Sequence, residues 1–154
     1  MICVLIVIVL ALVLIGSLCT GGPKQVVKEY YQAIEKCDAK KLLDTVPKDY
    51  LKEVMDEKDL TKRELLKEVQ AYLDKYYSGY DEKLDRDDFS DYFDFDLEED
   101  ADLEIKKAVQ FDLKVRYQSD EGKQTEKEEF IVFRYENGWY SMDAVFLVAM
   151  SAYL

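Results

Sequence analysis

Strict alternation of apolar and polar side chains between Ala108 and Gln118 constrains the fold of this chain more than any other sequence feature. The apolar members of the alternation are Val109, Phe111, Leu113, Val115 and Tyr117. A period of two places them on one face of a β-strand and the polar residues on the other face. The segment therefore predicts a strand with one buried and one solvated face, and the buried face needs other elements to cover it.

Turn residues extend this strand into an antiparallel meander across residues 103–140. The sequence Ser-Asp-Glu-Gly at 119–122 predicts a turn, and the apolar residues within 125–135 predict a returning strand. Asn-Gly at 137–138 predicts a tight hairpin that leads into a last short strand. The meander therefore supplies three strands.

A further strand is predicted before the meander. Phe93, Phe95 and Leu97 alternate with acidic residues between positions 92 and 98. At the start of the long strand, Lys107 interrupts the alternation and marks a bulge or an exposed stretch. We therefore expect a sheet of about four strands.

The first half of the chain carries helical patterns instead. Apolar residues at spacings of three and four predict an amphipathic helix of about four turns that includes Val27 to Cys37. Asp38 predicts the N-cap of a short helix that Pro47 ends, and residues 50–55 predict another short helix. Thr-Lys-Arg-Glu at 61–64 is a capping box that opens a longer helix.

The order of these elements predicts an α+β fold, in which helices pack on a curved antiparallel sheet. The chain has 154 residues, of which 49% are hydrophobic, and this is enough for one domain with its own core.

Charge excludes one class of partner. The formal net charge is -12 and the sequence pI is about 4.5, so contact with a phosphate backbone would be repulsive and we expect no nucleic-acid binding. Residues 81–104 alone carry thirteen acidic side chains against two basic ones.

No metal, cofactor or catalytic residue is predicted. The chain has no histidine, which removes the commonest general base and the commonest zinc ligand. Asp94, Asp96, Glu98 and Asp100 are spaced like calcium ligands, but the glycine and glutamate that a calcium-binding EF-hand loop requires are replaced by Glu99 and Ile105. No nucleophile motif or phosphate-binding loop is present either.

The N-terminal segment predicts a membrane attachment. Ile2 to Leu18 contains no charged residue and consists mostly of Val, Ile and Leu. As a helix these residues would extend about 26 Å, slightly less than the hydrocarbon thickness of about 30 Å. Both a short transmembrane anchor and the hydrophobic region of a signal fit this segment.

The end of the apolar segment resembles the membrane-proximal end of prokaryotic lipoproteins, in which small residues precede a cysteine that receives lipid. Here the sequence is Gly16-Ser17-Leu18-Cys19, and Cys19 is the candidate for lipidation. The usual pattern has a small residue directly before the cysteine and a leucine three positions before it, and this chain departs from it at both positions. If Cys19 is not lipidated, the segment remains as a transmembrane anchor.

Two observations disagree about orientation. Lys24 and Lys28 follow the apolar segment and no basic residue precedes it, so the positive-inside rule places the domain in the cytoplasm. The lipoprotein-like junction favours an extracytoplasmic domain, and we adopt that interpretation.

Two segments resemble the nuclear transport factor two-like superfamily, also called the cystatin-like cone fold. They are Val26 to Ile34 in the first helix and Glu136 to Tyr140 in the last hairpin, and the resemblance covers residues 23–143. It implies that a curved sheet wraps the first helix into a cone with a pocket. Many prokaryotic members of unknown function are similar in having a lipoprotein-type leader followed by one such domain.

The resemblance directs attention to the aromatic residues of the meander. The candidates for lining a pocket are Tyr117, Phe133, Tyr135 and Trp139, although aromatic residues in such positions more often fill the core. In this superfamily, catalysis uses Asp, Tyr or His side chains that project into the cone. Asp112 falls on the face opposite Phe111, which indicates a surface charge.

The chain ends in an apolar segment at 144–154. Eleven residues are too few to cross a bilayer as a helix. We expect the segment to pack across the cone or its open end; the alternative is contact with the membrane or a partner subunit.

These observations give four segments: 1–19, anchor or lipoprotein-type signal; 20–24, spacer; 25–143, α+β domain; and 144–154, apolar C-terminal segment. The expected function is a membrane-tethered, extracytoplasmic, non-enzymatic binding or scaffold domain. Its expected partners are membrane lipid through the N-terminal segment and a protein or small ligand. The alternatives are a small isomerase- or hydrolase-type enzyme that uses the cone pocket, and an accessory subunit of a membrane complex.

Overall fold

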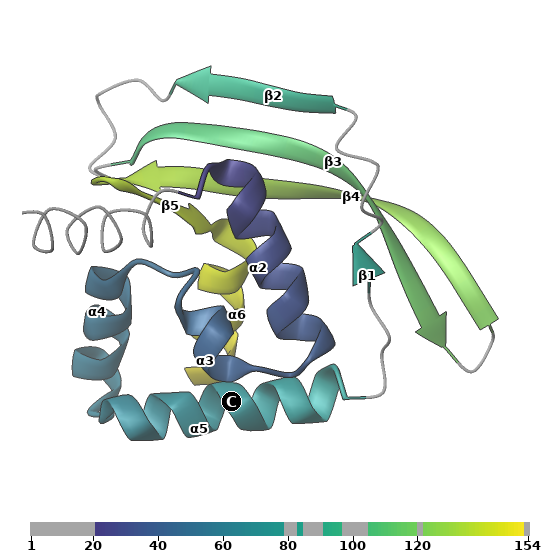
Figure 1. Ribbon diagram of the computed structural model, residues 1–154. Coiled ribbons are helices and arrows are strands. Elements are labelled where there is room, and N and C mark those ends of the chain that lie inside the picture. Colours follow the sequence, from purple (N-terminus) through teal and green to yellow (C-terminus); the bar gives the residue numbers. More distant parts are fainter. Residues whose placement is uncertain (1–20, 79–82, 85–90, 97–104, 120–121, 153–154) are drawn as a thin grey trace, which may run out of the picture.

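The computed structural model describes residues 21–78, 83–84, 91–96, 105–119 and 122–152. It confirms an α+β fold with helices and an antiparallel sheet (Figure 1). The helices are α2 (Pro23–Glu35), α3 (Ala39–Leu43), α4 (Lys48–Lys58), α5 (Lys62–Tyr76) and α6 (Met142–Ala152). The strands are β1 (Lys83–Leu84), β2 (Asp91–Asp96), β3 (Ile105–Ser119), β4 (Gly122–Tyr135) and β5 (Gly138–Ser141).

The sheet is built around the long strand β3. It pairs with β4 on one side and with both β1 and β2 on the other, and β5 lies beside β4. All of these pairs are antiparallel, and the register shifts between Ile105 and Lys107, which confirms the predicted bulge. The described part of the sheet has five strands where about four were predicted. The additional strand is β1, two residues in an acidic stretch without any alternation.

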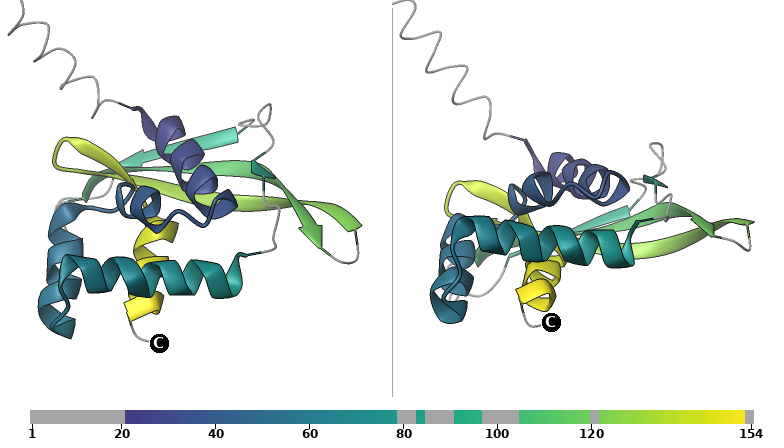
Figure 2. Two further views of the ribbon diagram at one scale, coloured as in Figure 1. Left: turned by 60° about the horizontal axis from the view of Figure 1, so that its bottom comes forward. Right: turned by 90° about the horizontal axis from the view of Figure 1, so that it is seen from below.

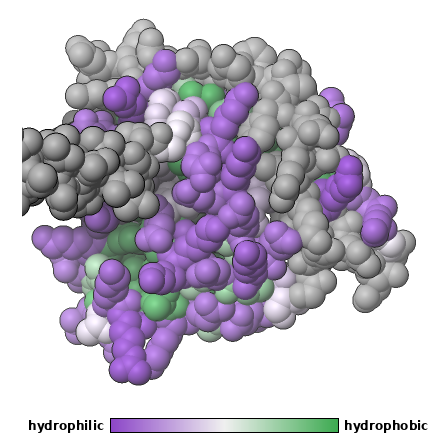
Figure 3. All heavy atoms as spheres, viewed as in Figure 1, coloured by the Kyte–Doolittle hydropathy of each residue, from purple (hydrophilic) through white to green (hydrophobic). Residues whose placement is uncertain are grey.

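The helices all lie on the concave side of the sheet, over which β3 and β4 bend (Figure 1). The turned views show α5 near the C-terminus and α2 closer to the sheet (Figure 2). The core between these layers contains Val27 and Ile34 from α2, Leu73 from α5, and Phe111 and Val132 from the sheet. On the face drawn in Figure 3, hydrophilic side chains dominate and hydrophobic groups occupy small areas between them.

The predicted helix starts are present at atomic detail. The side chain of Asp38 accepts a hydrogen bond from the backbone amide of Lys41 at 3.0 Å. At the start of α5, the amide of Glu64 donates to the Thr61 hydroxyl and the amide of Thr61 donates to the Glu64 carboxylate. Each bond satisfies an amide that the first turn of a helix leaves without a partner.

The last hairpin forms where it was predicted, but one residue earlier than the Asn-Gly pair suggests. Tyr135 pairs with Gly138, so the two loop residues are Glu136 and Asn137, and Gly138 is the first residue of β5. Glu136 has a φ of 50°, in the left-handed region. The sharp reversal that aligns β5 with β4 therefore rests on Glu136.

The apolar C-terminal segment forms helix α6 and packs into the core. Ala144, Leu147 and Val148 are buried, whereas Phe146 and Met150 are 63% and 55% exposed. The hydroxyl of Ser141 accepts a hydrogen bond from the amide of Ala144 at 3.0 Å and caps the first turn. The expected domain boundary at residue 143 thus falls within the first turn of a helix that shares the domain core.

The membrane prediction depends on residues outside the described part of the chain. Among the described residues, no helix combines the length and the apolar character needed to cross a membrane. Residues 1–20, with Cys19, are not described, and neither are Glu98 and Asp100 of the acidic stretch.

Candidate functional site

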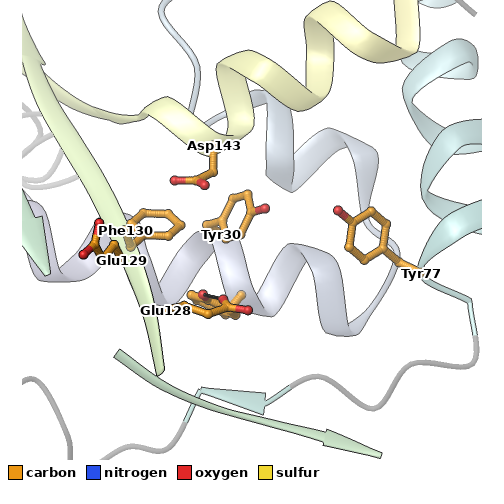
Figure 4. A pocket seen from close by; sticks show the side chains of 7 residues that line it. Tyr30, Tyr77, Glu128, Glu129, Phe130 and Asp143 are labelled. Carbon is orange, nitrogen blue, oxygen red and sulfur yellow. Dashed lines mark hydrogen bonds between the residues drawn. The ribbon is translucent and has the colours of Figure 1, made fainter. Parts of the chain in front are cut away.

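A pocket of about 320 Å³ lies between the sheet and three helices. Figure 4 shows side chains from α2, β4, α6 and the end of α5 around it. The lining residues are Tyr30, Tyr31, Tyr77, Glu128, Glu129, Phe130 and Asp143. Because these residues come from distant parts of the sequence, only the tertiary fold brings them together.

Three aromatic rings form one wall of the pocket. Tyr30 and Tyr31 lie on the sheet-facing side of α2 and are 9% and 4% exposed, and Phe130 of β4 is buried. The ring centroids of Tyr30 and Phe130 are 4.9 Å apart, and those of Tyr30 and Tyr31 are 5.3 Å apart in an edge-to-face arrangement. Such close packing holds the two tyrosine rings in fixed positions.

Glu128 lies on the face of β4 that faces the helices. It is two residues from Phe130, so the two side chains share a face, and its partner across the sheet is the buried Leu113. The hydroxyl of Tyr31 donates a hydrogen bond to Glu128 Oε2 at 2.8 Å. A partly buried carboxylate therefore has a fixed donor on α2, which offsets part of its desolvation.

Asp143 faces the same pocket from the first turn of α6 (Figure 4). Partial burial raises the pKa of its carboxyl, and the negative charge of Glu128 adds to this effect. Hydrogen bonds from the backbone amides of Asp143 and Ile131 oppose the increase in pKa. Glu128 and Asp143 are therefore close enough to interact electrostatically.

The remaining polar group comes from the end of α5. Tyr77 is the C-cap of this helix, and its ring points toward Tyr30 (Figure 4). Together with Tyr30 and Tyr31 it gives the pocket three phenolic hydroxyls. Glu129 completes the lining beside Phe130.

The chemistry of the pocket is acidic and phenolic. The polar side-chain groups that point into it are the carboxyls of Glu128 and Asp143 and three phenols, since Glu129 lies on the opposite face of β4, and none of the described lining residues is basic. Within the described ranges, no group of three or more His, Cys, Asp and Glu residues is arranged to hold a metal ion.

The described cysteine does not supply a nucleophile. Cys37 is partly buried, and its Sγ lies 3.8 Å from the carbonyl oxygen of Leu73. Burial raises the pKa of its thiol, and Asp74 raises it further. The thiol form is therefore favoured over the reactive thiolate, which agrees with a structural role for Cys37.

Of the four aromatic residues predicted to line a pocket, Phe133, Tyr135 and Trp139 are not among the residues that line this one. Phe133 is buried, and its ring lies 6.1 Å from that of Tyr140, its partner on β5. Trp139 pairs with Arg134, so it lies on the face of the sheet opposite to Phe133, which is the face toward the helices. Trp139 packs against the core, and the Tyr135 hydroxyl donates to Asp49 Oδ2 at 3.4 Å. The side chain of Tyr117 is outside the described structure.

One signal in the sequence points to the observed pocket. Along β4, Glu128 has the parity of the buried Phe130 and Val132, so its carboxylate stands on the face of the strand that those residues turn to the core. Tyr30 and Tyr31 carry no comparable signal, because aromatic residues in an amphipathic helix are ordinary core residues. Asp143 follows the last strand and could not be assigned to a site from its position.

No protein-family model, curated protein or solved structure matches this chain. The function is therefore argued from the chemistry of the pocket.

Proposed function

We propose that this chain is a membrane-tethered, extracytoplasmic domain that binds a ligand in the pocket between α2 and β4 without transforming it. The observation that carries this proposal is the pocket itself, in which aromatic packing and the Tyr31–Glu128 hydrogen bond fix the lining groups. Within the described structure, no buried side-chain nitrogen or oxygen lacks a hydrogen-bond partner. A lining with fixed and satisfied polar groups is typical of recognition.

The proposed fold family is the nuclear transport factor two-like superfamily. A curved sheet that bends over helix α2, with a pocket between the two, supports this assignment (Figure 1). The N-terminal apolar segment and the junction at Cys19 support attachment of the domain to a membrane.

The location is tested on the protein in its native membrane. We expect protease to cleave the domain in intact cells, and the intact mass to show either a chain that begins at a lipid-modified Cys19 or a retained anchor. A domain that becomes accessible to protease only after lysis would contradict the extracytoplasmic location.

Ligand binding is tested by native mass spectrometry of the full-length chain released from detergent. We expect a small molecule to remain bound to the wild type and to be lost from Glu128→Leu. This variant extends the apolar face of Phe130 and Val132 by one residue, so it removes a pocket carboxylate without placing a polar group in the core. The matched control, Glu126→Leu, changes an exposed residue of the same strand and should retain the ligand. A wild type without any bound molecule, or equal retention in both variants, would contradict binding in this pocket.

The enzyme alternative is favoured by one observation, the raised pKa of Asp143 beside phenolic hydroxyls. A carboxyl whose pKa is raised keeps its proton to a higher pH than an ordinary aspartate, which is the direction that a general acid in an isomerase- or hydrolase-type reaction needs. Turnover of a retained ligand by the wild type, with its loss in Asp143→Asn, would establish this alternative. The third possibility, an accessory subunit of a membrane complex, stays a prediction.

A further inference from the structure

We infer that the ligand of this pocket is a small organic amine, bound in its protonated form through its ammonium group. The inference rests on the proposed binding function and deepens it by naming the chemical class of the ligand. It follows from the arrangement of carboxyls, phenols and aromatic rings around one cavity.

The carboxylates of the pocket favour a ligand that donates hydrogen bonds. Carboxylates are acceptors only, and a carboxylate offers about four acceptor sites. Tyr31 uses one of these sites on Glu128 through its bond to Oε2. An ammonium group provides three N–H donors and fits the acceptors that remain.

The electrostatics of the pocket select a cation. The carboxyls of Glu128 and Asp143 face it, and none of the described lining residues carries a positive charge. An anion would meet uncompensated repulsion there, whereas a cation would relieve the repulsion between Glu128 and Asp143. A cation would also favour the ionised form of Asp143, which partial burial disfavours.

The size and spacing of the lining favour an organic cation over a metal ion. The volume of 320 Å³ lies at the lower end of the range of small-molecule pockets, about 300–1,000 Å³. The described acids do not form a group of three that could coordinate one metal ion. A carbon chain that carries the ammonium group would instead pack against the aromatic wall of Tyr30 and Phe130.

The test compares three probes of similar size on the full-length chain in detergent at fixed ionic strength. The probes are butylammonium, butan-1-ol and butyrate, and binding is followed by calorimetry and by ligand-detected NMR. We expect butylammonium to bind at least ten-fold more tightly than butan-1-ol, and butyrate not to bind. Equal affinity for butylammonium and butan-1-ol would overturn the inference, because binding would then depend on apolar contact alone.

Two matched variants locate the effect. Glu128→Gln keeps an acceptor for the Tyr31 hydroxyl and removes the charge, so we expect it to weaken butylammonium at least ten-fold with little change in thermal stability. Glu126→Gln makes the same charge change two residues away on the same strand, at an exposed position, and should alter affinity less than two-fold. Equal losses in the two variants would show that diffuse negative charge, and not the pocket, attracts the cation.

Further measurements distinguish a failure of the amine inference from a failure of the proposed binding function. Calcium or magnesium that competes with butylammonium at equal ionic strength, in the wild type but not in Glu128→Gln, would assign the pocket to a metal and overturn the amine. A neutral or anionic molecule that copurifies with the wild type and is lost from Glu128→Leu would overturn the amine and leave the binding function intact. Absence of any bound molecule or probe would contradict both.

Discussion

Glu128 shows that a charged residue can stand on the core-facing side of a strand. Its position on β4 faces the helices, where Phe130 and Val132 are buried. The charge is tolerated because Tyr31 donates a hydrogen bond to it and because β4 leaves the covered part of the sheet at this point, where Glu128 is only partly buried. The Glu128 carboxylate, with that of Asp143, gives the pocket its acidic side.

Removal of the Tyr31 hydroxyl should therefore destabilise the protein through its effect on Glu128, which lies on another element. We expect Tyr31→Phe to lower the free energy of unfolding by about 1–2 kcal/mol, because a partly buried carboxylate loses its donor. Urea unfolding measures the change. In the Glu128→Leu background the same substitution should have a much smaller effect; an undiminished effect would mean that the hydroxyl acts through another partner.

Asp143 should make stability depend on pH in the direction opposite to most carboxyls. Its folded pKa is raised above the ordinary value of 3.8, so between these two values the folded state binds more protons than the unfolded state. Stability from this group is therefore present below about pH 3.8 and is lost as the pH rises through the folded pKa.

The variant Asp143→Asn isolates this effect. We expect the free energy of unfolding of the variant to improve relative to wild type as the pH rises from 4 to 8, since the variant carries no charge to bury. Urea unfolding at several pH values measures the difference between the two proteins. A difference that stays constant across this range would contradict the raised pKa.

At the scale of elements, local sequence explains where the helices begin. The capping box of α5 joins Thr61 and Glu64, which are three residues apart and exposed, so it needs no tertiary contact. Hydrogen bonds from Thr61 also lower the pKa of Glu64. Both residues favour the helix start that the structure shows.

Loss of this cap should destabilise the protein measurably. We expect Thr61→Ala to lower the free energy of unfolding by about 1 kcal/mol, within the usual range of about 0.5–2 kcal/mol for N-caps. Thr61→Ser keeps the hydroxyl and is the matched control, with an expected change of less than about half of that value. Equal losses in the two variants, measured by thermal or urea unfolding, would show that the methyl group of Thr61 matters more than its hydroxyl.

The strands show both the strength and the limit of sequence patterns. Alternation predicted β2, β3 and the irregularity near Lys107, whereas a turn signal followed by a run of apolar residues predicted β4. It missed β1, whose two residues pair with Val115 and Arg116. A strand of two residues is too short to carry a period, so only its pairing with β3 defines it.

At the scale of the whole molecule, helix α6 completes the core. Leu147 is 5% exposed and packs within the cluster formed by α2, α5 and the sheet, whereas its neighbour Phe146 is 63% exposed. The sequence does not predict this difference in burial, since both residues belong to one continuous hydrophobic stretch.

Two neighbouring substitutions test this arrangement. We expect Leu147→Ala to lower the free energy of unfolding by about 2–5 kcal/mol, as removal of a buried leucine side chain commonly does. Phe146→Ala should change it by less than about 0.5 kcal/mol, as is usual for an exposed position. If urea unfolding shows similar losses of free energy for the two variants, Phe146 makes a contact that this structure of a single chain does not contain.

Local patterns were enough to predict the α+β class, the helix starts and the long strands, because hydrophobic period, capping residues and turns act over a few neighbouring residues. The pocket depends instead on contacts between elements that are distant in the sequence. Tyr31 and Glu128 are separated by 97 positions, and their hydrogen bond depends on how α2 lies across the sheet. That geometry results from packing of the whole core, which no local pattern encodes, and so Phe133, Tyr135 and Trp139, chosen from the strands alone, are not among the residues that line the pocket.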